Sequence, residues 1–168
     1  MIGAYPGTFN PPTVAHLAIA EQARDTCGLR RVDLVLSLDP LGKPGIRPTV
    51  DQRAEVLRQV AERRPWLGVT VTTHRLLADI AEGYDVLVLG ADKWAQVVDP
   101  AFYDDEAHRD ACLARLPRLA LAPRLGLPVP GHATLLPVDA DHVSSTAARG
   151  GDHHLMLPEA LACGLWTG

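Results

Sequence analysis

The sequence has little cysteine and no long apolar run. Its three cysteines lie far apart and form no C-x-x-C pair, which argues against a disulfide framework and against a zinc site. Charge or proline interrupts every apolar run well before the roughly 18 residues that a membrane span needs, and the first residues lack the pattern of a secretory leader. We therefore expect a protein of the reducing cytoplasm without a membrane partner.

The chain also has no excess of positive charge. It carries 16 lysines and arginines against 20 aspartates and glutamates, a formal net charge of -4. Such a balance gives no broad basic field, so we do not expect nucleic acid as a partner. A small anionic substrate held by a few local groups fits better. The 168 residues suffice for one hydrophobic core, and no repeat or linker divides them, so we expect a single domain over 1–168.

Apolar, β-rich segments alternate with helical patterns along the chain. Continuous apolar runs such as DVLVLG at 85–90 predict strands that are covered on both faces. The alternation predicts an α/β fold with a parallel sheet, right-handed crossovers and helices on both faces. The expected strands are 2–5, 32–38, 67–73, 85–90, 118–123 and 133–138, and the clearest helical patterns are 14–26, 50–64 and 104–116.

Residues 5–16, YPGTFNPPTVAH, place a crowded turn between the first expected strand and the first helix. The turn is neither the dinucleotide fingerprint G-x-G-x-x-G nor a P-loop. Gly7 allows a positive φ and a close approach of the backbone to a ligand. Thr13 can cap the helix and place His16 in its first turn, where free N–H groups and the helix dipole favour an anion. This pattern indicates a phosphate site with His16 as a donor, or else a tight turn with a solvated histidine.

A second candidate anion site lies in HVSSTAAR, residues 142–149. Ser144, Ser145 and Thr146 can cap a short helix and donate hydroxyl groups, and Arg149 lies about one turn later with a forked donor suited to phosphate. Ligands of open α/β sheets bind beyond the carboxyl ends of the strands. The turn at 90–94, GADKW, follows the fourth expected strand and is the third such turn.

Two motifs together resemble those of a known superfamily. GTFNPPTVAH is similar to the G-[ST]-F-[DN]-P-x-[HT]-x-G-H signature of nucleotidylyltransferases, and SSTAAR is similar to their I-S-S-T-x-x-R signature. Their order and separation are also those of the superfamily, and the resemblance extends from residue 1 to about 166. It implies a Rossmann-like, five-stranded parallel sheet with a small C-terminal helical part.

The two halves of the chain resemble different branches of this superfamily. YPGTFNPPTVAH, DPLGKPG at 39–45 and DQRAEVL at 51–57 are similar to phosphopantetheine adenylyltransferases. The GAD at 90–92, the arginine in SSTAAR and the tail LPEALACGLW at 157–166 are similar to nicotinate- and nicotinamide-mononucleotide adenylyltransferases. The second half has more discriminating features, so the resemblance to the pyridine-nucleotide branch is placed first. Phosphopantetheine transfer and cytidylyl transfer stay open as alternatives.

Three departures from the pyridine-nucleotide pattern bear on the acceptor. Thr13 and Ala15 replace a histidine and a glycine of the motif, and the short segment 74–83 has no counterpart of the S-Y-T segment that helps hold nicotinate mononucleotide. The identity of the acceptor therefore stays open. A module that binds nucleotide without catalysis is the alternative of another class.

The resemblance implies a reaction and several catalytic residues. An acceptor phosphate attacks the α-phosphorus of ATP in line and releases pyrophosphate, with no covalent enzyme intermediate. His16 would contact the α- and β-phosphate oxygens, and Lys43 would bring a mobile cation to the reacting phosphates. Thr8 and Thr13 would donate hydroxyl groups. The backbone of the turn at Gly7 and Phe9 would lie along the nucleotide.

The resemblance also implies how the rest of the nucleotide and the acceptor are held. Ser145, Thr146 and Arg149 would hold the β- and γ-phosphates, with Mg²⁺ bridging them. Asp92 would accept from ribose hydroxyls, or simply cap the helix that begins at residue 93. Trp94 would stack on an aromatic acceptor, although packing is the commoner role of such a side chain. Members of the superfamily often form homo-oligomers.

The remaining polar residues carry weaker signals. Arg53 has the position of a helix-surface residue, and contact with phosphate is its alternative role. His153 and His154 are adjacent in a polar segment without an evident third ligand, so we expect them to be solvated and expect no metal held by protein ligands.

Overall fold

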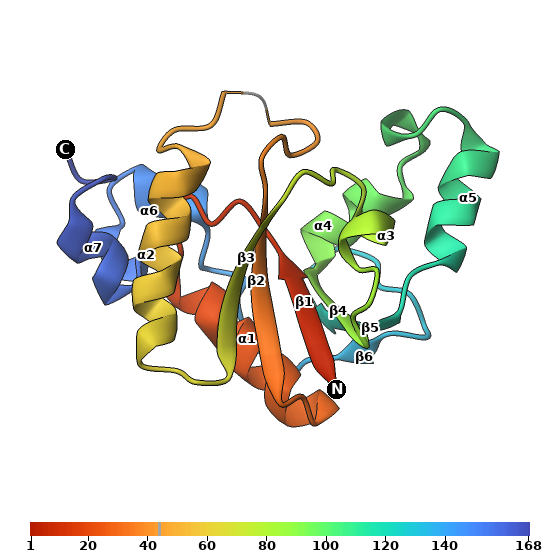
Figure 1. Ribbon diagram of the computed structural model, residues 1–168, viewed down its shortest axis with the longest axis horizontal. Helices are drawn as coiled ribbons and strands as arrows, with labels where there is room; N and C mark the ends of the chain where they lie inside the picture. Colours follow the sequence, from red (N-terminus) through yellow and green to blue (C-terminus); the bar gives the residue numbers. More distant parts are fainter. Residues whose placement is uncertain (44) are drawn as a thin grey trace.

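A computed structural model describes residues 1–43 and 45–168, and within them six parallel strands form one sheet in the order β3-β2-β1-β4-β5-β6 (Figure 1). The strands are β1 (Ile2–Pro6), β2 (Arg31–Ser37), β3 (Leu67–Thr72), β4 (Val86–Gly90), β5 (Arg118–Ala122) and β6 (Thr134–Leu135). The helices are α1 (Val14–Cys27), α2 (Val50–Glu62), α3 (Leu77–Ile80), α4 (Ala91–Val98), α5 (Glu106–Ala114), α6 (Ser145–Arg149) and α7 (Pro158–Cys163), with 3-10 turns at Pro100–Phe102 and His153–Leu155. None of these helices is long and apolar enough to cross a membrane.

The predicted α/β fold with a parallel sheet is confirmed, but the strand count of five is wrong. A sixth strand, β6, pairs in parallel with β5 through Ala120–Thr134 and Leu121–Leu135. It extends over two residues, soon followed by Pro137, which has no N–H to donate to a ladder. The sixth strand is therefore a short addition to the edge of the sheet.

Alternation of side chains along the strands gives the sheet two apolar faces. One face carries Tyr5, Leu34 and Val88 and is covered by α1 and α2, which contribute Ile19, Ala20, Ala23, Ala54, Leu57 and Val60. The other face carries Ala4 and Val35 and is covered by α3 and α4, which contribute Leu77, Ile80 and Val97, with Leu113 of α5 packed alongside. This burial on both faces explains why the strands are continuous apolar runs.

The C-terminal part packs beside the sheet rather than extending it. In Figure 1, α6 and α7 lie next to α2, and α3, α4 and α5 lie on the opposite side of the molecule. Ala148, Met156 and Trp166 form a small third cluster with Val56 of α2. The Leu157 N–H donates to the Pro12 carbonyl over 3.1 Å. The end of the chain is thereby joined to the turn that follows β1.

Candidate active site

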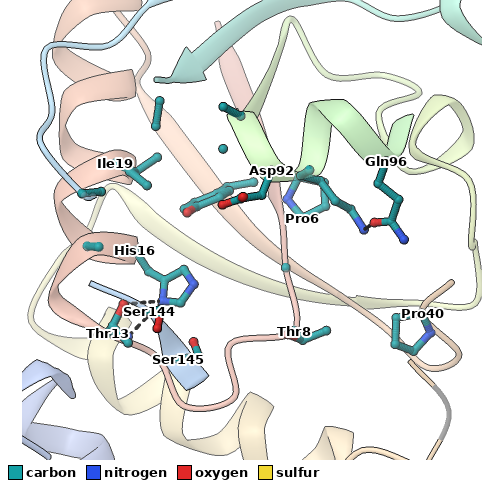
Figure 2. A pocket seen from close by; sticks show the side chains of 18 of the residues that line it. Pro6, Thr8, Thr13, His16, Ile19, Pro40, Asp92, Gln96, Ser144 and Ser145 are labelled. Atoms are coloured by element: carbon teal, nitrogen blue, oxygen red, sulfur yellow. Dashed lines mark hydrogen bonds between the residues drawn. The ribbon is translucent and has the colours of Figure 1, made fainter. Parts of the chain in front are cut away.

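A cavity of about 550 Å³ lies where β1, β4 and β5 end. Its walls come from the turn after β1, the first turns of α1 and α4, the segment that follows β2 and the start of α6. Figure 2 shows His16, Ser144 and Ser145 on one side of this cavity and Pro40 and Gln96 on the other. The three turns singled out in the sequence thus meet at one site.

The charge of the cavity differs from that of the whole chain. Among the described residues that line it, one carboxylate faces five cationic side chains, namely Lys43, Arg75, Lys93, Arg124 and Arg149. The one carboxylate, Asp92, is already paired with Arg124. A net charge of -4 for the chain therefore coexists with a strongly positive cavity. Such a local field attracts a polyanionic ligand.

His16 is held in one orientation by the residue that begins its helix. Its Nδ1 accepts from the backbone N–H of Thr13 over 2.9 Å and lies 2.9 Å from the Thr13 hydroxyl oxygen. A ring nitrogen that accepts a hydrogen bond carries no proton, so the proton of the neutral ring is on Nε2. Because Nδ1 is bound to the helix cap, Nε2–H is the donor left for a ligand.

The surroundings of His16 keep the ring neutral. Its centroid lies 5.0 Å from that of Phe9, edge to face, and 6.2 Å from that of Tyr5. Burial of the ring, followed by the positive charge of Lys43, lowers the pKa of His16 to about 4. A neutral donor of this kind can approach a phosphate oxygen without giving up its proton at neutral pH.

We expect His16 to make the protein less stable as the pH falls from about 6.5 towards 4. The pKa of the unfolded histidine is about 6.5 and that of the folded one is lower, so the unfolded chain binds the proton first in this range. The loss of stability is absent above about pH 6.5. It grows as the pH falls, until His16 is protonated in both the folded and the unfolded chain. Urea unfolding at several pH values, compared with His16→Gln, measures it. Parallel pH curves for the two proteins would show that the ring titrates normally.

Thr13 acts on His16 in this structure. Its side chain is 1% exposed, and its hydroxyl contacts the imidazole. We expected this hydroxyl to donate to phosphate; Thr13 lines the cavity, as that role requires, and in this structure its hydroxyl lies against Nδ1 of His16. The contacts of Thr13 with Nδ1 hold the His16 ring in place, and donation to phosphate stays a prediction.

The turn after β1 has an unusual backbone at Phe9 rather than at Gly7. Phe9 has a φ of 45° and a ring that is 1% exposed, whereas Gly7 does not have a positive φ. A Cβ at Gly7 would lie 2.9 Å from the Phe9 ring. Gly7 thus leaves room for this buried ring, and Gly7 and Thr8 line the cavity.

Arg53 lies beneath this turn, and the expectation of a helix-surface residue is wrong. Its side chain belongs to α2 but is 3% exposed. Its Nη1 donates to the Thr8 carbonyl, and its Nε donates to the Pro48 carbonyl over 3.0 Å. The guanidinium therefore fixes the backbone of the turn after β1.

The start of α6 forms the predicted cap. The hydroxyl oxygen of Ser144 accepts from the backbone N–H of Ala147 over 3.0 Å, while Ser145 donates to the Pro11 carbonyl over 2.9 Å. Thr146 accepts from Arg149 Nη2 over 3.3 Å. The serines, Thr146 and Arg149 all line the cavity, so SSTAAR lies side by side with GTFNPPTVAH.

Arg149 and the C-terminal tail both hold Asn10. Arg149 Nη1 donates to the Asn10 carbonyl, and Trp166 Nε1 donates to the Asn10 side-chain oxygen over 2.6 Å. No local pattern indicates Trp166 at this site, because more than 150 residues separate it from Asn10. Both contacts fix the turn at Asn10, whereas Arg53 binds it at Thr8.

The segment that carries Lys43 is fixed at two points. Arg75 pairs with the Asp39 carboxylate over 3.2 Å, and the Gln96 side chain donates to the Leu41 carbonyl over 3.5 Å. Lys43 is exposed and lines the cavity, as its expected role requires. In the lysine segment 39–45, residue 44 lies outside the described residues.

Asp92 and Trp94 occupy different environments at the start of α4. Asp92 lines the cavity and is paired with Arg124, so a ribose hydroxyl would share this carboxylate with a guanidinium. Trp94 is not among the lining residues; it packs on the apolar face of the sheet and against His132, with ring centroids 6.4 Å apart. The packing role of Trp94 is the one that the structure supports.

Several lining residues were not picked out from the sequence, namely Arg75, Lys93, Gln96 and Arg124. Lys93 Nζ donates to the Gln96 side-chain oxygen over 2.7 Å. Burial, followed by the charge of Lys43, lowers the pKa of Lys93 to about 8. The available signal was the position of Lys93 directly after the GAD motif, at the end of a buried strand.

The two adjacent histidines do not form a metal site in the described part of the chain. His153 and His154 lie in a 3-10 turn, and no group of three His, Cys, Asp or Glu side chains is placed to hold an ion among the residues that the structure describes. These histidines are not among the lining residues of the cavity.

Comparison with known proteins agrees with this geometry. A probable nicotinate-nucleotide adenylyltransferase from Salinibacter ruber is 33% identical over 122 residues, which cover 64% of this chain and 63%, less than two thirds, of the relative. One from Geobacter sulfurreducens is 31% identical over 150 residues, 81% of this chain and 66% of the relative. One from Bordetella avium is 27% identical over 182 residues, 96% of this chain and 92% of the relative. Residues 4–150 match the cytidylyltransferase-like family, and the chain belongs to that family.

Proposed function

We propose that this chain is a nucleotidylyltransferase that transfers AMP from ATP to the phosphate of a pyridine mononucleotide and releases pyrophosphate. The observation that carries the proposal is the cavity in which the donor His16 faces a field of five cations and one paired carboxylate, counted over the described lining residues. A triphosphate and an acceptor phosphate are the ligands that such a field suits. Three relatives named as probable nicotinate-nucleotide adenylyltransferases favour this acceptor.

The chemistry needs positioning and charge stabilisation rather than a base. The attacking acceptor phosphate is already an anion, and the P–O bond to the leaving pyrophosphate breaks as the new one forms. Nε2–H of His16 donates to the oxygen on which charge develops, and its orientation is set in advance by Thr13. Lys43 and Arg149 neutralise the phosphates on either side. Ser144 and Ser145 hold the neighbouring backbone in place.

Magnesium fits this site as part of the nucleotide. Mg²⁺ usually keeps several waters and binds through one or two carboxylates together with substrate phosphates. Asp92 is the one carboxylate among the described lining residues, and Arg124 already occupies it. We therefore propose that the ion would be held mainly by the phosphates of ATP beside Ser145, Thr146 and Arg149, and would supply charge neutralisation there.

The proposal also covers the chain as a whole. Residues 1–168 act as one nucleotidylyltransferase domain, because the tail residue Trp166 supports the same turn that carries the site. The cysteines Cys27, Cys112 and Cys163 are free thiols, which fits a cytoplasmic enzyme.

A screen for pyrophosphate release tests the proposed activity. The full chain is incubated with Mg²⁺ and either ATP or CTP, together with nicotinate mononucleotide, nicotinamide mononucleotide or phosphopantetheine. We expect release with ATP and a pyridine mononucleotide. Release with phosphopantetheine alone would reassign the acceptor, and release with CTP alone would reassign the nucleotide. Binding of ATP by calorimetry without pyrophosphate from any acceptor would indicate a non-catalytic module.

A further inference from the structure

The cavity has two chemically different ends. His16, Ser145 and Arg149 surround the end where the proposed function places the triphosphate. The opposite end is formed by α3, α4 and the segment after β2, and Figure 2 shows Gln96 and Pro40 on this side, away from His16. An acceptor whose phosphate reaches the α-phosphorus must place the rest of its body at this second end.

The second end combines an apolar wall with cations. Val35, Leu77 and Ile80 line it and belong to one cluster of the buried core. Lys93 and Lys43 stand beside this wall, close enough for the charge of Lys43 to lower the pKa of Lys93. Over residues 1–43 and 45–168, neither lysine has a carboxylate partner, whereas Arg75 and Arg124 do.

Lys93 is the more firmly held of the two lysines. Its ammonium donates to Gln96, and Gln96 in turn donates to the Leu41 carbonyl. A Cβ at Gly42 would lie 3.4 Å from the Gln96 amide nitrogen, so Gly42 lies close to this side chain. Lys93 thus presents a half-buried positive charge, held by Gln96, whose remaining two N–H donors have no carboxylate partner in the described part of the chain.

We propose that Lys93 binds a second anionic group on the acceptor, the carboxylate of nicotinate mononucleotide, and so selects this acid over the corresponding amide. The inference rests on the proposed function and adds a specificity-determining residue to it. A flat ring packs against the apolar wall formed by Leu77 and Ile80, and a carboxylate on that ring meets the ammonium group. The neutral amide leaves the half-buried charge of Lys93 without a counter-ion, which costs binding free energy.

The residues at this position also explain how the site works without the S-Y-T segment. The segment between β3 and β4 is short and forms α3, whose buried residues supply the apolar wall. The polar contact to the acceptor then has to come from another element. Lys93 on α4 lies in the same cavity and is able to supply it.

Isothermal titration calorimetry of the full chain at pH 7 tests the inference. Nicotinate mononucleotide and nicotinamide mononucleotide are titrated into the wild type, Lys93→Met and Arg63→Met, the last of which removes an exposed cation outside the cavity. We expect the wild type and Arg63→Met to bind the acid about tenfold or more tightly than the amide, on the scale of one desolvated charge pair. In Lys93→Met, binding of the acid falls by that factor, binding of the amide stays, and the ratio approaches one.

Kinetics separate this inference from the proposed function. The ratio of kcat/KM for the two mononucleotides is measured in the same proteins, with Lys93→Gln as a second variant if Lys93→Met does not fold. Pyrophosphate release by the wild type with an unchanged ratio in the Lys93 variants would overturn the role of Lys93 and leave the proposed function intact. Equal binding of the two mononucleotides by the wild type would likewise overturn the role of Lys93 and leave the proposed function intact. A wild type that binds neither and releases no pyrophosphate would overturn both.

Discussion

Replacement of His16 by alanine is expected to lower kcat by a hundredfold or more in a protein that still folds. The imidazole is oriented from behind by Thr13, kept neutral by burial, and presents Nε2–H to the cavity. Loss of one preorganised donor to a developing oxyanion costs about 2.7 to 4 kcal/mol of transition-state stabilisation, or about a hundredfold to a thousandfold in rate. Steady-state pyrophosphate release with saturating ATP and acceptor measures the loss.

A melting curve and one control variant separate chemistry from stability. His16→Ala also removes the acceptor for the Thr13 N–H at the helix start, and such a change costs about 1 kcal/mol of stability. A melting curve followed by circular dichroism should therefore show a modest shift and an intact fold. His154→Ala removes an exposed histidine outside the cavity and should leave turnover unchanged. Turnover of His16→Ala near that of the wild type would remove this residue from the mechanism.

The sequence was sufficient to predict the framework of the site. Strand runs such as VLVLG are apolar without interruption because both faces of the sheet are covered, and that pattern is local. The helix 14–26 could be placed because Thr13 and Gly28 are good cap residues, and both form the caps. Since His16 is three residues from Thr13, its place in the first helical turn followed from the sequence alone.

The contacts that support the site could not be predicted, because they join distant segments. The Arg53 pattern is that of a helix-surface cation, and its burial depends on the Thr8 carbonyl, 45 residues away in the sequence. The same holds for Trp166, which reaches Asn10 from the other end of the chain. Hydrophobic periodicity does not reveal a buried arginine, since its apolar stem and charged head have opposite preferences.

The backbone conformation of the turn after β1 could also not be predicted from the sequence. Glycine is the residue that ordinarily takes a positive φ, and in this turn Gly7 allows one. The structure has it at Phe9, whose ring is buried between the sheet and α1. The packing of that ring outweighs the local preference, and Gly7 serves instead as the space into which the ring fits.

Replacement of the buried Arg53 by methionine is expected to weaken both stability and ATP binding. Methionine fills a similar volume, but it leaves the Thr8 and Pro48 carbonyls without the donors that Arg53 supplies. Loss of hydrogen bonds from a charged group, with buried acceptors left unpaired, costs on the order of 2 to 3 kcal/mol. Because the Thr8 turn then loses its support from α2, the KM for ATP should rise by about tenfold, on the scale of one such bond.

A matched arginine on the same helix makes this prediction specific. Arg58 is exposed on α2 and pairs with Glu55 over 3.4 Å, so Arg58→Met should change the free energy of unfolding by about 0.5 kcal/mol or less. Urea unfolding and ATP titration are compared for both variants and for Arg53→Lys, which keeps the charge but has a single ammonium to serve two carbonyls. The expected order of stability is wild type, then Arg58→Met, then Arg53→Lys, then Arg53→Met. If Arg53→Met matched Arg58→Met in both measurements, the buried guanidinium would have no part in holding the turn after β1.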